Sequence, residues 1–154
     1  MKKYIHFGSD TYDPGLVTEV QKQTIRLKPD KGLWGSPVSS HFGWKDWCLD
    51  ERFRLDTFDK YFMFRIDKKA KILRIHREED ILPFIIKDEL ALHFQLTSIL
   101  DKLDRDKIYS KFDGMELYIA DNWSMHDGMF YTWDCDSICV WNPDVILPMR
   151  KEET

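Results

Sequence analysis

Short runs of alternating hydrophobic and polar residues recur along this chain, a pattern typical of strands with one buried face. The first run spans residues 2–8 and sets His6 and Tyr4 on the same face. A second strand is predicted at residues 32–36, and it ends where Pro37 lacks the N–H that a strand ladder requires. The N-terminal part therefore predicts short strands separated by turns.

The middle of the chain predicts a β-hairpin and then a helix. Residues 60–66 and 70–76 are rich in β-branched and aromatic side chains, and a polar turn joins them. From Lys87 to about Leu103 the apolar spacing becomes helical, so we expect a helix that covers the core. Its apolar stripe consists of Leu92, Leu96, Ile99, Leu100 and Leu103.

The last third predicts strands again, at residues 114–120, 128–133 and 136–141. Both faces of the third strand are largely apolar, which is typical of a central strand covered on both sides. Asp136 lies in this strand, and burying a carboxylate costs free energy unless the group is paired or hydrogen-bonded. Its presence indicates either a functional role or an aspartate that backbone amides satisfy.

These elements predict a single α+β domain over residues 1–149, followed by a disordered tail at 150–154. With 154 residues, the chain is long enough for a hydrophobic core, and its 43% hydrophobic and 32% charged residues are typical of a soluble globular protein. No apolar run approaches the roughly 20 residues needed to cross a bilayer, and the first residues do not form a signal peptide. We therefore expect a cytoplasmic protein that does not contact membranes.

Cysteine content and charge narrow the chemistry further. Cys48, Cys135 and Cys139 form no disulfide framework, and their spacing with His126 matches no established zinc pattern. The formal net charge of −4 lacks the basic excess of a nucleic-acid-binding protein, and the lysine and arginine cluster at 68–77 is typical of a solvated strand edge. We therefore expect no metal, and a protein partner rather than a nucleic acid.

The most unusual stretch runs from Lys28 to Cys48 and contains three tryptophans, three glycines and two prolines. Its glycines and prolines predict a loop, a short strand and a second loop. Ser39 and Ser40 are candidate N-caps for a helix in which Trp44 and Trp47, three residues apart, share one face. The stretch forms either a flat slot for a planar ligand or a tryptophan-rich local core.

Three short motifs follow one another in an order that points to a family. They are His6 followed by Gly8-Ser9, then Lys31-Gly32-Leu33-Trp34-Gly35-Ser36 with the later serines and Trp47-Cys48, and finally Asp136-Ser137-Ile138-Cys139-Val140-Trp141. In this order the chain resembles ADP-ribosyltransferases of the diphtheria-toxin and poly(ADP-ribose) polymerase type, including small bacterial and phage-encoded members. The resemblance implies two packed, mostly antiparallel β-sheets with flanking helices, which together build an NAD site.

The resemblance also implies which residues hold the polar parts of NAD. His6 would bond the ribose of the adenosine half, and the backbone of Phe7 would meet the nicotinamide carboxamide. Ser9 would lie near the ribose. Ser39 or Ser40 would match the serine that bonds the carboxamide.

The nicotinamide ring and the reacting bond involve the remaining residues. Trp34 would be the plane on which nicotinamide stacks, and Trp47 the second wall, with Trp44 on the same helix face. Asp136 would match the catalytic acid. The family has glutamate there, and the shorter aspartate leaves Glu116, Asp121 and Asp134 as alternatives for this role.

The activity implied is mono-ADP-ribosyl transfer from NAD to a macromolecular acceptor, with release of nicotinamide. A carboxylate near the ribose would stabilise the positive charge that develops as the nicotinamide–ribose bond breaks, and no metal is required. Two alternatives stay open. The protein could hydrolyse NAD with water as the acceptor, or it could be a catalytically inactive copy of the fold that binds or inhibits another protein.

Overall fold

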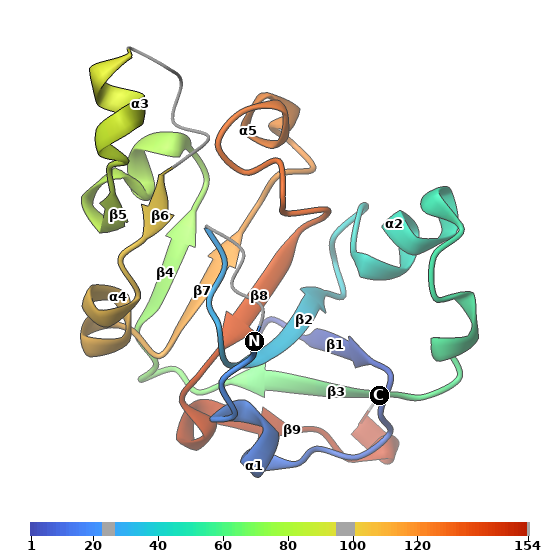
Figure 1. The fold of residues 1–154 in the computed structure, drawn as a ribbon. Coiled ribbons are helices and arrows are strands. Elements are labelled where there is room, and N and C mark those ends of the chain that lie inside the picture. The colour runs from blue at the N-terminus through green and yellow to red at the C-terminus, as the bar shows by residue number, and fades with distance from the viewer. Residues whose placement is uncertain (23–26, 95–100, 154) are drawn as a thin grey trace.

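The computed structural model describes residues 1–22, 27–94 and 101–153. They form an α+β molecule built on a seven-stranded sheet, with a separate two-stranded ribbon (Figure 1). The strand order of the large sheet is β4-β7-β8-β2-β1-β3-β9. Its strands are β1 (Tyr4–Phe7), β2 (Leu33–Pro37), β3 (Tyr61–Ile66), β4 (Ile72–Ile75), β7 (Gly114–Leu117), β8 (Ser137–Val140) and β9 (Ile146–Pro148).

Short helices flank the sheet, and the ribbon stands apart from it. The ribbon pairs β5 (Ile85–Ile86) with β6 (Lys102–Leu103). The α-helices are α1 (Pro14–Val17), α2 (Trp44–Glu51), α3 (Glu89–His93), α4 (Arg105–Lys111) and α5 (Trp123–Asp127). The 3-10 helices are η1 (Leu55–Thr57), η2 (Glu78–Asp80), η3 (Leu82–Phe84), η5 (Pro143–Val145) and η6 (Lys151–Glu153), the last within the tail predicted to be disordered.

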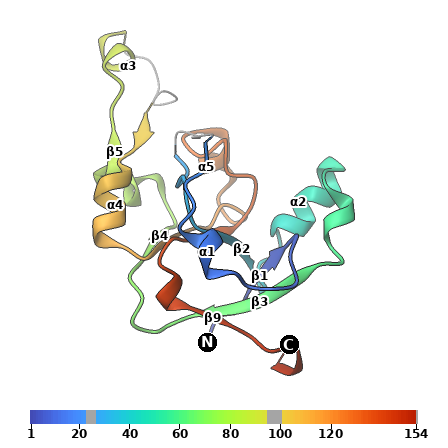
Figure 2. The ribbon, with the colours of Figure 1, turned by 60° about the horizontal axis from the view of Figure 1, so that its bottom comes forward.

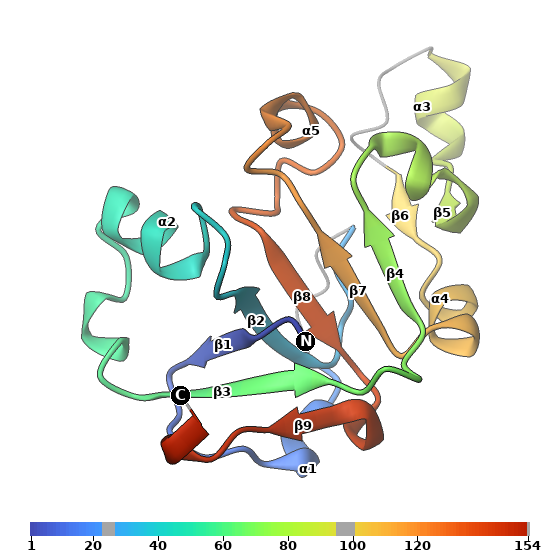
Figure 3. The same cartoon turned by 180° about the vertical axis from the view of Figure 1, so that it is seen from behind.

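The large sheet is mixed and bent. Strands β4 and β7 run parallel, whereas the other neighbours in the sheet are antiparallel. In Figures 1 and 3, β1, β3 and β9 run across the direction of β4, β7 and β8, and β2 joins the two groups. The expectation of two separate packed sheets is thus replaced by one continuous bent sheet.

The core lies on both faces of the sheet, as expected for a central β8. Cys139 and Trp141 pack in one cluster with side chains of α4 and α5, whereas Ile138 and Val140 pack in a second cluster with Tyr4 of β1. Figure 2 shows α1 beside β1 and β3. Strand β8 therefore carries the two-sided apolar pattern that the sequence predicted.

The predicted hairpin at 60–76 is wrong. Strand β3 pairs with β1 and β9, and β4 pairs with β7 instead. In the turn between them, the Asp67 N–H donates to Val145 O and the Lys71 N–H to Asp113 Oδ2. These bonds to other segments carry the chain from one part of the sheet to the other rather than back on itself.

The predicted helix at 87–103 is also wrong in its extent. Of the described residues in this stretch, Glu89–His93 is helical and Lys102–Leu103 is strand β6, whereas the predicted positions 96, 99 and 100 lie outside the described residues. Leu92 of the expected core stripe is 62% exposed. Asp101, expected on the polar face, is buried because Lys87 Nζ and the Asp88 N–H both bond its carboxylate.

Two further local predictions need correction. Residues 128–133 form turns rather than a strand, with the Phe130 N–H donating to Met125 O and the Trp133 N–H to Phe130 O. Helix α2 is capped at Gly43 and not at Ser39 or Ser40, since Asp46 accepts from the Gly43 N–H. Across the described ranges, none of the helices has the length and apolar character needed to span a membrane.

Candidate functional site

A cavity of about 630 Å³ lies where β1, β2, α2 and the chain entering β8 meet. This volume is within the range of small-molecule sites, roughly 300–1,000 Å³. The lining of the cavity consists of Ile5, His6, Phe7, Gln21, Lys28, Pro29, Trp34, Gly35, Ser36, Trp44, Trp47, Phe53, Arg54, Trp133, Asp134, Cys135 and Ser137.

His6 presents a defined tautomer in this cavity. Its Nδ1 lies 2.7 Å from Trp34 O, and because a carbonyl only accepts, Nδ1 carries the hydrogen. Burial lowers the pKa of His6 below its ordinary 6.5, with the bond to Trp34 opposing the shift. The neutral imidazole therefore keeps Nε2 as a hydrogen-bond acceptor.

The tryptophans predicted to form a slot do share this cavity. Trp44 and Trp47 stack on each other, with ring centroids 5.1 Å apart and planes 19° apart, as residues three apart on one helix face should. Trp34 lies on β2 with its ring 5.1 Å from that of Trp133. The cavity thus has aromatic surfaces on two sides, from α2 and from β2.

Among the candidate acids, Asp134 is the one that lines the cavity. Burial raises the pKa of Asp134, and the positive charge of Lys28, which lines the same cavity, opposes that shift. Burial conversely lowers the pKa of Lys28, and Asp134 opposes it. The cavity therefore combines a carboxylate and an ammonium that are both partly removed from water.

Asp136 has a different environment, although it is only two residues away. Its Oδ1 accepts from the Ile119 N–H at 2.7 Å and the Ala120 N–H at 2.9 Å, and its Oδ2 accepts from Ser40 Oγ at 2.8 Å. It is 5% exposed and is not in the cavity lining. Both carboxylate oxygens of Asp136 thus accept hydrogen bonds. This is the structural alternative from the sequence, an aspartate whose buried charge is satisfied by backbone amides.

The serines also differ from the sequence expectation. Ser36 lines the cavity, and its Oγ accepts from the Trp44 N–H at 2.8 Å. Ser39 is exposed, Ser40 bonds Asp136, and neither is in the cavity lining. Ser36 stands two residues after Trp34 on β2, and this period-two spacing is the signal that would have placed both on one strand face.

Of the remaining predicted site residues, one lines the cavity and the others do not. Phe7 lines the cavity and packs edge-on against Phe58 at 5.3 Å. Ser9 does not, since its hydroxyl donates to Thr11 O. The alternative acids Glu116 and Asp121 are also elsewhere: Glu116 is fully buried against Lys2, and the Asp121 side chain is 85% exposed.

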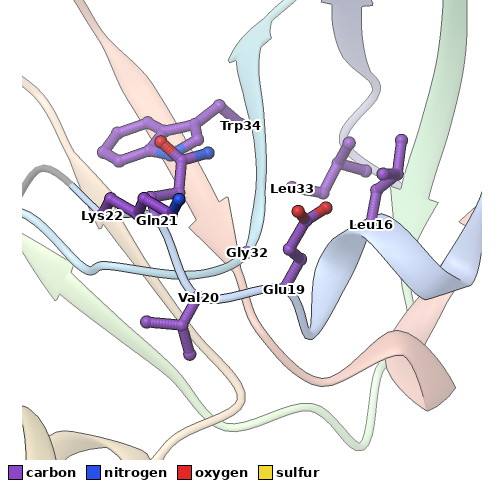
Figure 4. A pocket seen from close by; sticks show the side chains of 8 residues that line it. All are labelled: Leu16, Glu19, Val20, Gln21, Lys22, Gly32, Leu33 and Trp34. Carbon is purple, nitrogen blue, oxygen red and sulfur yellow. The ribbon is translucent and has the colours of Figure 1, made fainter.

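A second cavity, of about 440 Å³, adjoins the first. Figure 4 shows it with Trp34 on one side and Leu16 on the other. Gln21 and Trp34 line both cavities, so the Trp34 ring stands between them. Glu19 and Lys22 give the second cavity polar groups of both signs.

The three cysteines are buried and free, and burial raises the pKa of each thiol, that of Cys135 to about 11. They are therefore neutral thiols near pH 7 rather than reactive thiolates. In the part of the chain that the structure describes, no three histidine, cysteine or acidic side chains cluster as metal ligands would.

Comparisons with protein-family models, with curated proteins and with solved structures find no match to this chain.

Proposed function

We propose that this protein is a mono-ADP-ribosyltransferase that uses NAD and transfers ADP-ribose to a protein acceptor in the cytoplasm. The single observation that carries the proposal is the shared cavity. It gathers His6, Trp34, Trp44, Trp47 and Asp134 from segments far apart in the sequence. We further propose that the bent sheet is an ADP-ribosyltransferase-like fold, in which β1, β2 and β8 hold the co-substrate.

The aromatic side chains give the nicotinamide a place to bind. Nicotinamide is a planar leaving group, and offset or tilted aromatic contacts each contribute on the order of 1 kcal/mol beyond the area they bury. We place the ring against Trp34, with the stacked pair of Trp44 and Trp47 as the facing wall. In this arrangement Ser36, rather than Ser39 or Ser40, is the serine within reach of the carboxamide.

His6 fits the ribose by hydrogen-bond polarity. With Nδ1–H held by Trp34 O, the neutral imidazole has an acceptor at Nε2. A ribose hydroxyl donates to such an acceptor. The bond would fix the sugar relative to the acid, since positioning of this kind lowers the entropic part of the barrier.

Asp134 is the acid that we assign to the reaction, in place of Asp136. As the bond between C1′ of the ribose and the nicotinamide nitrogen breaks, its electron pair leaves with nicotinamide and positive charge develops on the ribose. A desolvated carboxylate stabilises that charge strongly. The acceptor then gives an electron pair to C1′ and loses a proton.

Incubation with NAD labelled in the adenosine half tests the proposal. The expected result is free nicotinamide together with label bound to protein in a cell lysate. Free ADP-ribose without bound label would favour hydrolysis, the second enzymatic alternative. If the wild-type protein neither binds NAD nor releases nicotinamide, the proposal fails and a binding or inhibitor module becomes the better account.

A further inference from the structure

Lys28 brings a positive charge into the cavity without a direct ionic partner. Its side chain lines the cavity, and its Nζ lies 5.7 Å from the centroid of the Trp34 ring. Within the described ranges, no carboxylate forms an ion pair with it. Burial lowers the pKa of Lys28, because a buried ammonium loses part of its hydration, and the charge of Asp134 in the same cavity opposes that shift.

The backbone around Lys28 is held in place although it belongs to no helix or strand. Arg105 of α4 donates from Nε at 3.2 Å and from Nη2 at 2.9 Å to Lys28 O. On one side, Trp133 Nε1 donates to Leu27 O at 2.9 Å. On the other, the Tyr109 hydroxyl bonds both the N–H and the carboxylate of Asp30. The base of the Lys28 side chain is therefore fixed before any ligand binds.

A desolvated cation at a fixed position favours an anionic ligand, because the ligand replaces the lost hydration. Lysine binds phosphate groups as a point charge. Of the parts of NAD, the nicotinamide ring is itself cationic and the sugars are neutral, so the diphosphate is the group that Lys28 would attract. Arg54 also lines the cavity, but it is exposed and keeps its hydration.

We propose that Lys28 is the anion-binding residue of the cavity and makes it a site for nucleotides that carry a diphosphate, rather than for nucleosides. The identity of the ligand rests on the function proposed above. The anion preference rests on Lys28 alone, so the two claims separate in experiment.

The test is calorimetric binding of ADP-ribose and of nicotinamide riboside to the wild-type protein and to variants at Lys28. ADP-ribose carries the diphosphate, and nicotinamide riboside carries no phosphate. We expect Lys28→Met to weaken ADP-ribose binding about 10- to 100-fold, the effect of losing one charge-assisted bond. Nicotinamide riboside should lose no affinity in this variant, because it carries no phosphate and its cationic ring gains nothing from a second positive charge near Trp34.

Three further variants control for folding and for general charge effects. Lys28→Arg should keep ADP-ribose affinity within a few-fold. Lys28→Gln should lose ADP-ribose affinity as Lys28→Met does, and it replaces Lys28→Met in the test if that variant does not fold. Lys31→Met is the matched control, because Lys31 lies three residues away with its Nζ over the Tyr109 ring and outside the cavity lining. It should bind ADP-ribose as the wild type does.

Unchanged ADP-ribose affinity in both Lys28→Met and Lys28→Gln would overturn the inference, as would an equal loss in Lys31→Met. A wild-type protein that binds neither ligand would overturn it as well. If ADP-ribose binding depends on Lys28 but the wild type releases no nicotinamide from NAD, the anion site stands and the proposed transferase activity fails. If nicotinamide is released while Lys28→Met and Lys28→Gln bind ADP-ribose as the wild type does, the transferase activity stands and Lys28 is not the anion-binding residue.

Discussion

Asp134 and Asp136 are two positions apart, but their carboxylates meet different surroundings. Asp136 has three hydrogen-bond donors and lies outside the cavity, whereas Asp134 lines the cavity near the charge of Lys28. Strict strand alternation predicts that both point to one face. The chain bends at residues 135–136, before β8 begins at Ser137, and this bend separates them. A one-dimensional pattern could not distinguish the two roles.

Replacing Trp34 by alanine should weaken NAD binding about 5- to 150-fold, the range for loss of an aromatic stacking surface under a planar ring. Trp34→Phe should recover part of the affinity, because it keeps an aromatic face. Titration of NAD by calorimetry measures both. Wild-type affinity in Trp34→Ala, with an unchanged urea midpoint, would remove Trp34 from the site.

The protonation of His6 should be visible in its pH titration. Burial lowers its pKa below the ordinary value of 6.5, so His6 is neutral in the folded protein at pH 7. Because the unfolded chain binds the proton more readily, the full stability is present above pH 6.5 and is lost as the pH falls through the folded-state pKa. NMR of the His6 ring, assigned with a His6→Gln variant, should give a midpoint below 6.5. A midpoint at or above that value would contradict the buried, neutral imidazole.

Among the helices and strands, single polar side chains fix how one element is placed relative to the next. Ser36 and Asp46 bond the first amides of α2 and so set the position of Trp44 and Trp47 relative to β2. Asp136 ties the start of β8 to the chain that leaves β7. Each contact depends on a single polar side chain, and those of Asp136 join segments 16 and 17 residues apart in the sequence. Sequence periodicity predicted α2 and the six other strands of the large sheet, but not β9 or the two strands of the ribbon, nor the bonds that orient these elements.

Removing the Asp136 carboxylate should destabilise the fold. Asp136→Ala leaves the buried Ile119 and Ala120 N–H groups without an acceptor, at a cost of about 2–4 kcal/mol in the free energy of unfolding. Asp136→Asn keeps an acceptor oxygen for both amides and should lose much less. Urea denaturation of the two variants provides the measurement. Equal stability of Asp136→Ala and wild type would show that these bonds do not hold the segment.

Helix α2 ends at Arg52, whose backbone conformation is strained for a residue other than glycine. Its C-cap, Arg52, has φ 53° and ψ 42°, in the left-handed region that favours glycine. Arg52→Gly should be more stable than Arg52→Ala by about 1 kcal/mol. At the exposed helical position Leu49 the order should reverse, with glycine less stable than alanine by about 1 kcal/mol. The same order at both positions, measured in urea, would argue against a left-handed cap.

Over the whole molecule, the sequence predicted the α+β class and the doubly covered strand β8, but not the path of the chain. The segment 60–76 reads as a hairpin locally, yet β4 finds its partner in β7 some forty residues later, and no local pattern encodes that pairing. The buried Glu116, bonded by Lys2 and Tyr4, likewise joins the N-terminus to strand β7. Trp34, Trp44 and Trp47 were predictable as one group because they lie close together in sequence, whereas Trp133 lines the same cavity from a distant segment and was not predicted. The sequence did not single out Asp134 as the aspartate that lines the cavity, because its position depends on the bend at residues 135–136.

The central claim is that one cavity binds NAD and uses Asp134 to break the bond to nicotinamide. Its most direct test is the rate of nicotinamide release from NAD by the wild type and by two isosteric variants, Asp134→Asn and Asp136→Asn. We expect release by the wild type and by Asp136→Asn, and a rate at least about 100-fold lower for Asp134→Asn, the scale of losing one electrostatic stabiliser. Wild-type rates in Asp134→Asn, or a loss confined to Asp136→Asn, would contradict this claim.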